Sequence, residues 1–200
     1  TGVIGITLSK NQSAYSRKML AGIPTNRTVE IRMQGWEEFD DKVDRIVSIG
    51  AFEAFKVERY PAFFDKAYSV LPDDGRMLLH TILAHNQAFF RDNGIKITLS
   101  DLKFMKFIEQ EIFPGGRLPA VEDIEKLAAD SGFTLERVHL LQPHYARTLD
   151  MWAENLEKNK DAAIAMQGQE VYDRYMHYLT GCADFFHRGV TNVGQFTLQK

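Results

Sequence analysis

The chain has 200 residues, of which 44% are hydrophobic, 12% aromatic and 26% charged, a composition typical of one globular domain and not of a disordered chain. Its 24 Lys and Arg residues against 27 Asp and Glu give a formal net charge of -3 without any basic cluster, which argues against a nucleic-acid partner. The single cysteine, Cys182, excludes an internal disulfide and a cysteine-based zinc site. No apolar run approaches the roughly 18 to 20 residues that span a bilayer, and residues 1–8 lack the basic stretch of a signal peptide, so we expect a cytoplasmic protein.

Short β-branched runs alternate with amphipathic helical stretches, a pattern typical of a parallel α/β sheet. Residues 3–8 form the first expected strand, and Ser9 is the expected N-cap of a helix that continues to about residue 21. The further expected strands are residues 28–33, 43–49, 77–83, 133–141 and 193–198. The further expected helices are residues 57–70, 121–129, 145–156 and 170–186.

Residues 84–119 interrupt this alternation because they are too many for a simple connection from a strand to a helix. The apolar residues that recur there near helical spacing are Leu102, Met105, Ile108 and Ile112. Two phenylalanines, Phe104 and Phe107, widen this band beyond what one buried face normally needs. We interpret residues 84–119 as a substrate-binding insert within a single domain that comprises residues 1–200.

A Gly-rich loop after the first strand, which nucleotide-type α/β domains use to bring backbone N–H groups close to a cofactor, does not occur. Gly2 and Gly5 lie inside the strand pattern, and Gly115 and Gly116 follow a proline in the insert. The chain opens directly on a strand. We therefore expect that an N-terminal strand-loop-helix unit is missing from it and that the chain binds a cofactor weakly or not at all.

Six segments, spread from one end of the chain to the other, carry a specific pattern: GITLSKNQ at 5–12, QGWE at 34–37, SIGAFE at 48–53, EIFPGG at 111–116, PHYARTL at 143–149 and YMHYLTGC at 175–182. This pattern resembles the mycolic acid cyclopropane synthase and methyltransferase family, within the cyclopropane-fatty-acid synthase group. The resemblance implies an α/β fold of the Rossmann-like, class I S-adenosylmethionine-dependent methyltransferase type.

The same resemblance implies an enzyme that transfers a methyl group from S-adenosylmethionine to a cis double bond of a long mycolic or fatty acyl chain. A carbocation follows, and it ends as a cyclopropane or a methyl branch. The implied partners are a long-chain unsaturated acyl lipid, an acyl carrier protein that delivers it, and the surface of a membrane.

The resemblance also assigns roles to individual residues. The implied contacts of the cofactor are Thr7, Leu8, Ser9, Gln12, Trp36, Glu37 and Ile49. The implied catalytic residues are Glu53, His80, Tyr145 and Cys182, and the first three would hold a bicarbonate ion that acts as the active-site base. The implied contacts of the acyl chain are Phe113, Leu118 and Leu149. Ala54 stands where several cyclopropane synthases of the family carry a histidine, which weighs against cyclopropane formation relative to methyl branching.

Without the resemblance, each of these residues has a structural interpretation. Glu53 is a carboxylate at a helix start, His80 a core histidine, Tyr145 a buried helix tyrosine, Cys182 a small packed hydrophobe and Trp36 a plug at the sheet edge. The histidines show no metal-ligand spacing, so we assign no metal. A non-catalytic module that binds acyl chains or acyl carriers stays an alternative, whereas a dinucleotide oxidoreductase is disfavoured because no fingerprint loop is present.

Overall fold

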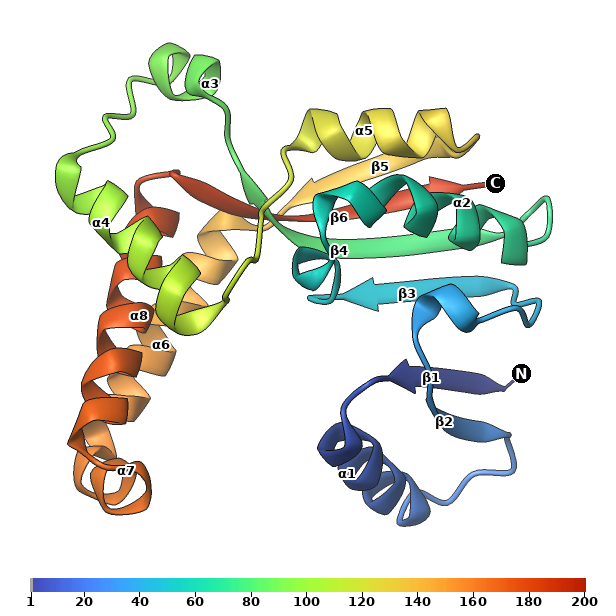
Figure 1. Ribbon diagram of the computed structural model, residues 1–200, viewed down its shortest axis with the longest axis horizontal. Coiled ribbons are helices and arrows are strands. Elements are labelled where there is room, and N and C mark those ends of the chain that lie inside the picture. The colour runs from blue at the N-terminus through green and yellow to red at the C-terminus, as the bar shows by residue number, and fades with distance from the viewer. Residues whose placement is uncertain (1) are drawn as a thin grey trace.

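A sheet of four strands and a separate pair of strands form the framework of the chain (Figure 1). In the computed structural model, which describes residues 2–200, the order of the larger sheet is β3 (Arg45–Ile49), β4 (Arg76–Ala84), β6 (Thr191–Gln199) and β5 (Thr134–Leu140). The pair consists of β1 (Val3–Thr7) and β2 (Val29–Met33). Every strand expected from the sequence is present, with bounds within two residues of the expected ones.

The direction of β6 differs from the expected parallel sheet. β1 and β2 are parallel, as are β3 and β4, but β6 runs antiparallel to both of its neighbours, β4 and β5. The cause is the helical segment between β5 and β6, which leaves the sheet and returns to it at the same end (Figure 1). A backbone hydrogen bond of 2.8 Å from Leu141 N to Val193 O joins the residue after β5, where the chain leaves the sheet, to the start of β6, where it returns. The larger sheet is therefore mixed.

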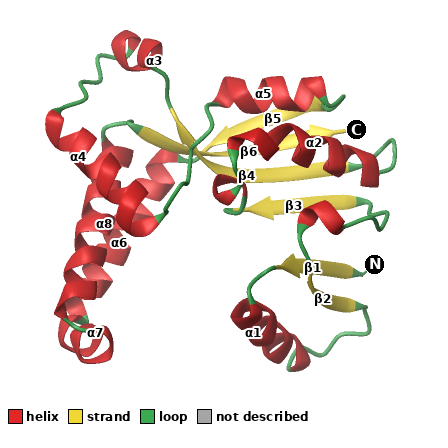
Figure 2. Ribbon diagram, viewed as in Figure 1, coloured by secondary structure: helices red, strands yellow, loops and turns green. Residues whose placement is uncertain are grey.

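Two helices, α2 (Tyr60–Val70) and α5 (Val121–Asp130), cover one face of the larger sheet (Figure 2). Between them and the sheet lies the main hydrophobic core, whose fully buried side chains include Phe52, Phe64, Met77, Leu79, Ile124, Phe196 and Leu198. The β1–β2 pair carries its own helix, α1 (Lys10–Ala21). Ser9 caps α1 as expected, because its Oγ accepts a hydrogen bond from Gln12 N at 3.2 Å.

Three helices follow β5: α6 (Gln142–Lys158), α7 (Lys160–Gln167) and α8 (Gln169–His187). α6 and α8 lie side by side beyond one end of the sheet (Figure 1). The sequence predicts α6 and α8 but not α7, which is separated from α8 only by Gly168 with φ of 87°. The core between α6 and α8 includes Ala146, Leu149, Leu179 and Phe186. Over residues 2–200, no helix has both the length and the apolar character required to cross a bilayer.

The segment between β4 and α5 forms α3 (Gln87–Asp92), α4 (Leu99–Phe107) and a π-helical turn (Ile108–Ile112). Its expected apolar stripe is only partly correct, since Leu102 is 56% exposed while Phe104 is the buried apolar residue of α4. The ring of Phe104 packs edge-on against Phe185 of α8, with centroids 5.1 Å apart. Gly181 makes this approach feasible, because a Cβ at that position would lie 2.2 Å from the Phe104 ring.

Candidate functional site

The expected cofactor residues lie at the carboxyl ends of the parallel strands, where open α/β sheets bind ligands. Thr7 is the last residue of β1, and Ile49 is the last residue of β3. Trp36 and Glu37 begin a short turn that follows β2 after a gap of two residues. The expected cofactor residues therefore lie at the carboxyl ends of β1, β2 and β3.

The side chains after β1 form a local hydrogen-bond network. Thr7 Oγ1 donates to Gln12 Oε1 at 2.7 Å and accepts from Ser9 N at 3.1 Å. Because Ser9 Oγ also accepts from Gln12 N, the three polar side chains are fixed around the first turn of α1. Leu8, between them, is 76% exposed. The structure thus groups all four residues expected here.

Trp36 packs at the border between the main core and a surface cavity. Its ring contacts Phe55 and Phe63, with centroids 5.6 and 5.4 Å away. Arg59 lies over the indole at 5.4 Å and forms an ion pair with Glu37 at 2.6 Å. The cavity has a volume of about 490 Å³ and is lined by Leu8, Trp36, Glu37, Ala54, Phe55, Lys56 and Arg59. Trp36 therefore has both a packing role and an exposed edge that a ligand can reach.

Glu53 holds a carboxylate that the protein satisfies at one oxygen only. It lies in the turn after β3, next to the fully buried Phe52, and its Oε1 accepts a 2.5 Å hydrogen bond from Ile82 N on β4. The other oxygen, Oε2, is buried and has no hydrogen-bond partner among residues 2–200. A buried carboxylate oxygen without a partner is costly, and such an atom is a candidate contact for a ligand with a hydrogen to donate.

His80 and Tyr145 come together from β4 and α6. His80 Nε2 lies 2.8 Å from the Tyr145 hydroxyl, and His80 Nδ1 lies 3.2 Å from Nε2 of Gln195 on β6. Burial lowers the pKa of His80, and the charge of Glu53 opposes this shift. Burial and the Glu53 charge both raise the pKa of Tyr145. The charge of Glu53 thus acts on both His80 and Tyr145. Gln195, a residue that the sequence analysis missed, joins this group through its contact with His80.

Cys182 lies on α8 and packs against the same apolar cluster between α6 and α8 as Tyr145 does. Burial raises the pKa of Cys182 to about 12, and the neighbouring Tyr178 opposes this shift. Burial likewise raises the pKa of Tyr178 to about 12. Among residues 2–200 no hydrogen bond joins Cys182 to Glu53, His80 or Tyr145. The thiol is therefore protonated at neutral pH and is a poor nucleophile.

The three residues expected to contact an acyl chain lie in two environments. Leu149 is buried between α6 and α8, at 4% exposure. Phe113 is half exposed, and its ring meets Tyr178 of α8 edge-on at 6.0 Å. Leu118 is also partly exposed, next to Arg117, whose carbonyl accepts a 3.0 Å hydrogen bond from the Tyr60 hydroxyl. The hydrogen bond from Tyr60 thus fixes the end of the insert, around Arg117, to the start of α2, close to the turn that contains Glu53.

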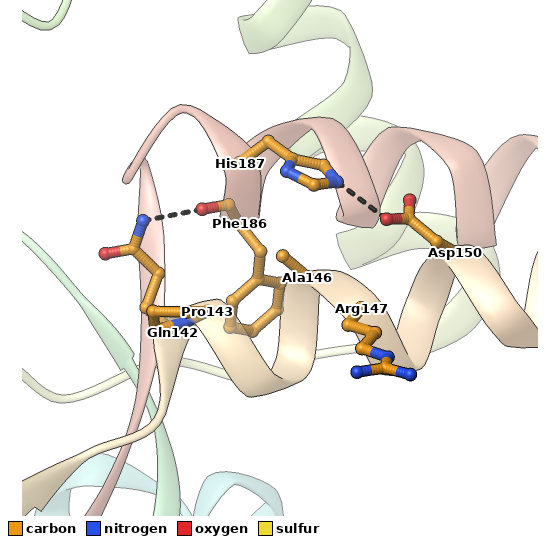
Figure 3. A pocket seen from close by; sticks show the side chains of 7 residues that line it. All are labelled: Gln142, Pro143, Ala146, Arg147, Asp150, Phe186 and His187. Atoms are coloured by element: carbon orange, nitrogen blue, oxygen red, sulfur yellow. Dashed lines mark hydrogen bonds and ion pairs between the residues drawn. The ribbon is translucent and has the colours of Figure 1, made fainter.

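A second cavity, of about 380 Å³, lies between α6 and α8 and contains none of the expected site residues (Figure 3). It is lined by Gln142, Pro143, Ala146, Arg147, Asp150, Phe186 and His187. His187 Nε2 lies 2.8 Å from Asp150, and Gln142 donates to the Phe186 carbonyl at 2.7 Å. Within residues 2–200, no group of three or more His, Cys, Asp or Glu side chains is arranged to hold a metal ion.

Comparison with known proteins gives one consistent result. The family model described as "Mycolic acid cyclopropane synthetase" matches residues 1–196. The S-adenosylmethionine-dependent methyltransferase UmaA of Mycobacterium tuberculosis (strain ATCC 25618 / H37Rv) is 66% identical over 198 residues, which cover 99% of this chain and 69% of UmaA.

Solved structures agree with the sequence matches. The cyclopropane synthase MmaA2 from Mycobacterium tuberculosis superposes with a TM-score of 0.97 at 52% identity, covering 100% of this chain and 70% of that one. Mycolic acid cyclopropane synthase CmaA1, complexed with SAH and CTAB, superposes with a TM-score of 0.94 at 51% identity and the same coverage. The Rossmann-like methyltransferase fold expected from the sequence is confirmed.

Proposed function

This chain belongs to the mycolic acid cyclopropane synthase family, a family of S-adenosylmethionine-dependent methyltransferases, and from that premise we propose that it methylates a cis double bond of a long acyl chain. The π electrons of the double bond form the new carbon–carbon bond to the methyl group, and the bond from that group to sulfur breaks. The acyl carbocation then loses a proton and becomes a cyclopropane or a methyl-branched chain. Family membership favours this catalytic function over a non-catalytic acyl-binding module.

The observation that carries the proposal is the convergence of Glu53, His80 and Tyr145 beside the carboxyl end of β3 and the middle of β4. Loss of a proton from a carbocation needs a base in a site from which water is excluded. Glu53 Oε2 is a buried hydrogen-bond acceptor with no partner among residues 2–200. The Tyr145 hydroxyl, which contacts His80, belongs to the same cluster of polar side chains. The three side chains supply acceptors and a donor in a buried setting, as this chemistry requires.

The polar group also fits a bicarbonate ion. The ion's hydroxyl can donate to Glu53 Oε2, and its oxygens can accept from Tyr145, so that both groups would be satisfied. When bound, bicarbonate supplies the base that accepts the proton lost by the acyl chain. The uncharged thiol of Cys182 adds no negative charge near such an anion. We include bicarbonate, held by Glu53, His80 and Tyr145, in the proposal.

The cofactor fits the carboxyl-end residues. The fixed hydroxyls of Thr7 and Ser9 and the amide of Gln12 suit the ribose, and the accessible edge of Trp36 suits the adenine. Glu37 and Leu8 line the same cavity as Trp36. Ile49, exposed at the end of β3, is paired with His80 of the neighbouring strand β4. When bound, S-adenosylmethionine supplies the methyl group. The complex of CmaA1 with SAH supports binding of this cofactor in the family.

For the acyl chain we propose the insert, residues 84–119, together with α6. The candidate contacts are Phe113, Leu118 and Leu149. The complex of CmaA1 with CTAB, a cationic molecule with a long alkyl chain, supports an acyl-binding role for the family. In this proposal an acyl carrier protein delivers the chain in the cytoplasm, and contact with a membrane surface is a second route of delivery.

Mass spectrometry of acyl products tests the proposed function. The purified chain is incubated with S-adenosylmethionine and an unsaturated acyl chain, presented either on acyl carrier protein or in vesicles. A gain of one CH₂ without a reducible double bond identifies a cyclopropane, and the same gain with a double bond retained identifies a methyl branch. Calorimetry with S-adenosylhomocysteine is run in parallel. Cofactor binding without any product would favour the non-catalytic acyl-binding alternative.

A further inference from the structure

Gln195 contacts His80 from the neighbouring strand. The two residues are directly opposite each other in the antiparallel pairing of β4 and β6, so their side chains lie on the same face of the sheet. Gln195 Nε2 lies 3.2 Å from His80 Nδ1. An amide nitrogen only donates hydrogen bonds, so His80 Nδ1 accepts this one and carries no hydrogen.

This contact decides where the proton of His80 is held. A neutral imidazole has one N–H group, and with Nδ1 unprotonated that group is Nε2. His80 Nε2 then donates to the Tyr145 hydroxyl oxygen, 2.8 Å away. Because the tyrosine oxygen accepts from His80, its own hydrogen is free to bond with another acceptor. With the opposite tautomer, Tyr145 would donate to His80 and would have no hydrogen left for a ligand.

We propose that Gln195 is a positioning residue that fixes the Nε2–H tautomer of His80 and thereby directs the Tyr145 hydroxyl hydrogen toward the acceptor that the site binds. The part of this inference that concerns methyl transfer rests on the proposed function. The part that concerns the tautomer rests only on the contacts of His80.

The other groups around His80 are compatible with this arrangement. The Glu53 carboxylate favours a proton on His80, while burial among neighbouring strands disfavours the charged imidazolium. In the imidazolium both nitrogens carry hydrogens, so Nδ1–H would face the Gln195 amide hydrogens. His139 of β5 lies opposite Gln195 on its other side, and Ile49 of β3 lies opposite His80. Tyr145 completes the set of titratable groups.

Nitrogen NMR of the histidine rings tests the proposal on the chain itself, without a ligand. His80→Gln identifies the His80 signals by their loss. In the wild type we expect an unprotonated Nδ1 and a protonated Nε2. Gln195→Glu has nearly the same shape but places an acceptor at Nδ1, so we expect the pattern to invert. Thr197→Val, two residues along the same face of β6, is the matched control and should leave the pattern unchanged.

If Gln195→Glu does not fold, Gln195→Leu provides a second test of the proposal. It removes both donor and acceptor, so we expect a mixture of the two tautomers. A protonated Nδ1 in the wild type, or a wild-type pattern in the folded glutamate or leucine variant, would overturn the proposal.

Kinetics separate a positioning role from a purely structural one. For Gln195→Glu we expect the kcat of methyl transfer to fall by roughly a hundredfold, with KM for S-adenosylmethionine unchanged. Equal kcat in Gln195→Glu and wild type would overturn the catalytic part of the inference. If the wild type shows the expected tautomer but transfers no methyl group, the role of Gln195 at His80 is supported and the proposed function is contradicted.

Discussion

His80 Nε2 and the Tyr145 hydroxyl lie 2.8 Å apart although the two residues are 65 positions apart in the chain. His80 comes from β4 and Tyr145 from the first turn of α6 after the chain has left β5, so the contact ties the helical part of the molecule to its sheet. Glu53 acts on the pKa of both residues through its charge. The same contact therefore links the packing of α6 to the electrostatics of the candidate site.

Removal of the Tyr145 hydroxyl tests this contact. Tyr145→Phe keeps the ring that stacks on Phe186 at 5.7 Å, so we expect a loss of only about 1 kcal/mol in the free energy of unfolding. Methyl transfer should fall by roughly a hundredfold or more, because the hydroxyl is the proposed donor to the site. Urea unfolding and initial rates measure the two effects. Tyr175→Phe, at an exposed tyrosine, is the control. An unchanged rate in Tyr145→Phe would remove Tyr145 from the catalytic group.

Neutralisation of Glu53 tests whether its carboxylate serves function or folding. In Glu53→Gln the amide oxygen can still accept from Ile82 N, while the buried charge and its unpartnered oxygen are lost. We expect the free energy of unfolding to stay within about 1 kcal/mol of wild type and methyl transfer to fall by at least about a hundredfold. Glu58→Gln, in the next turn and exposed, is the matched control. A variant destabilised by more than about 2 kcal/mol that keeps its activity would identify Glu53 as a structural residue.

Local patterns in the sequence were sufficient for the strands and for the start of α1. The alternation of apolar residues depends only on the period of a strand, and Ser9 caps α1 through a contact with Gln12, three residues away. These features need no knowledge of the distant chain. The cofactor roles of Thr7 and Ile49, the last residues of β1 and β3, came instead from the family resemblance, because the strand pattern alone does not indicate what a strand end binds.

Features that depend on distant contacts were missed. The direction of β6 is set by where α8 ends, and only the antiparallel register places Gln195 opposite His80. The buried face of α4 is selected by α8, which accommodates the Phe104 ring at Gly181 and leaves Leu102 exposed. Helical periodicity places Leu102 and Phe104 on different faces of the helix, but it does not indicate which of these apolar faces packs on a neighbouring helix.

A methyl group at Gly181 tests the packing between α4 and α8. In an exposed helix, Gly→Ala normally stabilises by about 0.5–1 kcal/mol. In Gly181→Ala the new Cβ would lie 2.2 Å from the Phe104 ring, so we expect the opposite sign, a loss of about 1–3 kcal/mol. Thermal or urea unfolding measures the change, and Thr180→Ala, at the exposed neighbour, is the control. The double variant with Phe104→Leu should recover part of the loss. Stabilisation by Gly181→Ala alone would show that α4 does not pack on α8 at this point.

The pH dependence of stability tests the burial of His80. Burial lowers the pKa of His80 below its ordinary value of 6.5, so between these two pKa values the unfolded chain binds a proton that the folded chain does not. The stability that neutral His80 contributes is therefore complete above pH 6.5 and is lost as the pH falls through the folded-state pKa. His85, whose pKa is also lowered by burial, adds to the loss in the same direction. We expect His80→Gln to lose less stability than wild type when urea unfolding is compared at about pH 7.5 and about pH 5.5, whereas His144→Gln, at an exposed histidine, should follow wild type. Equal losses in His80→Gln and wild type would show that His80 takes up its proton as readily in the folded chain as in the unfolded one.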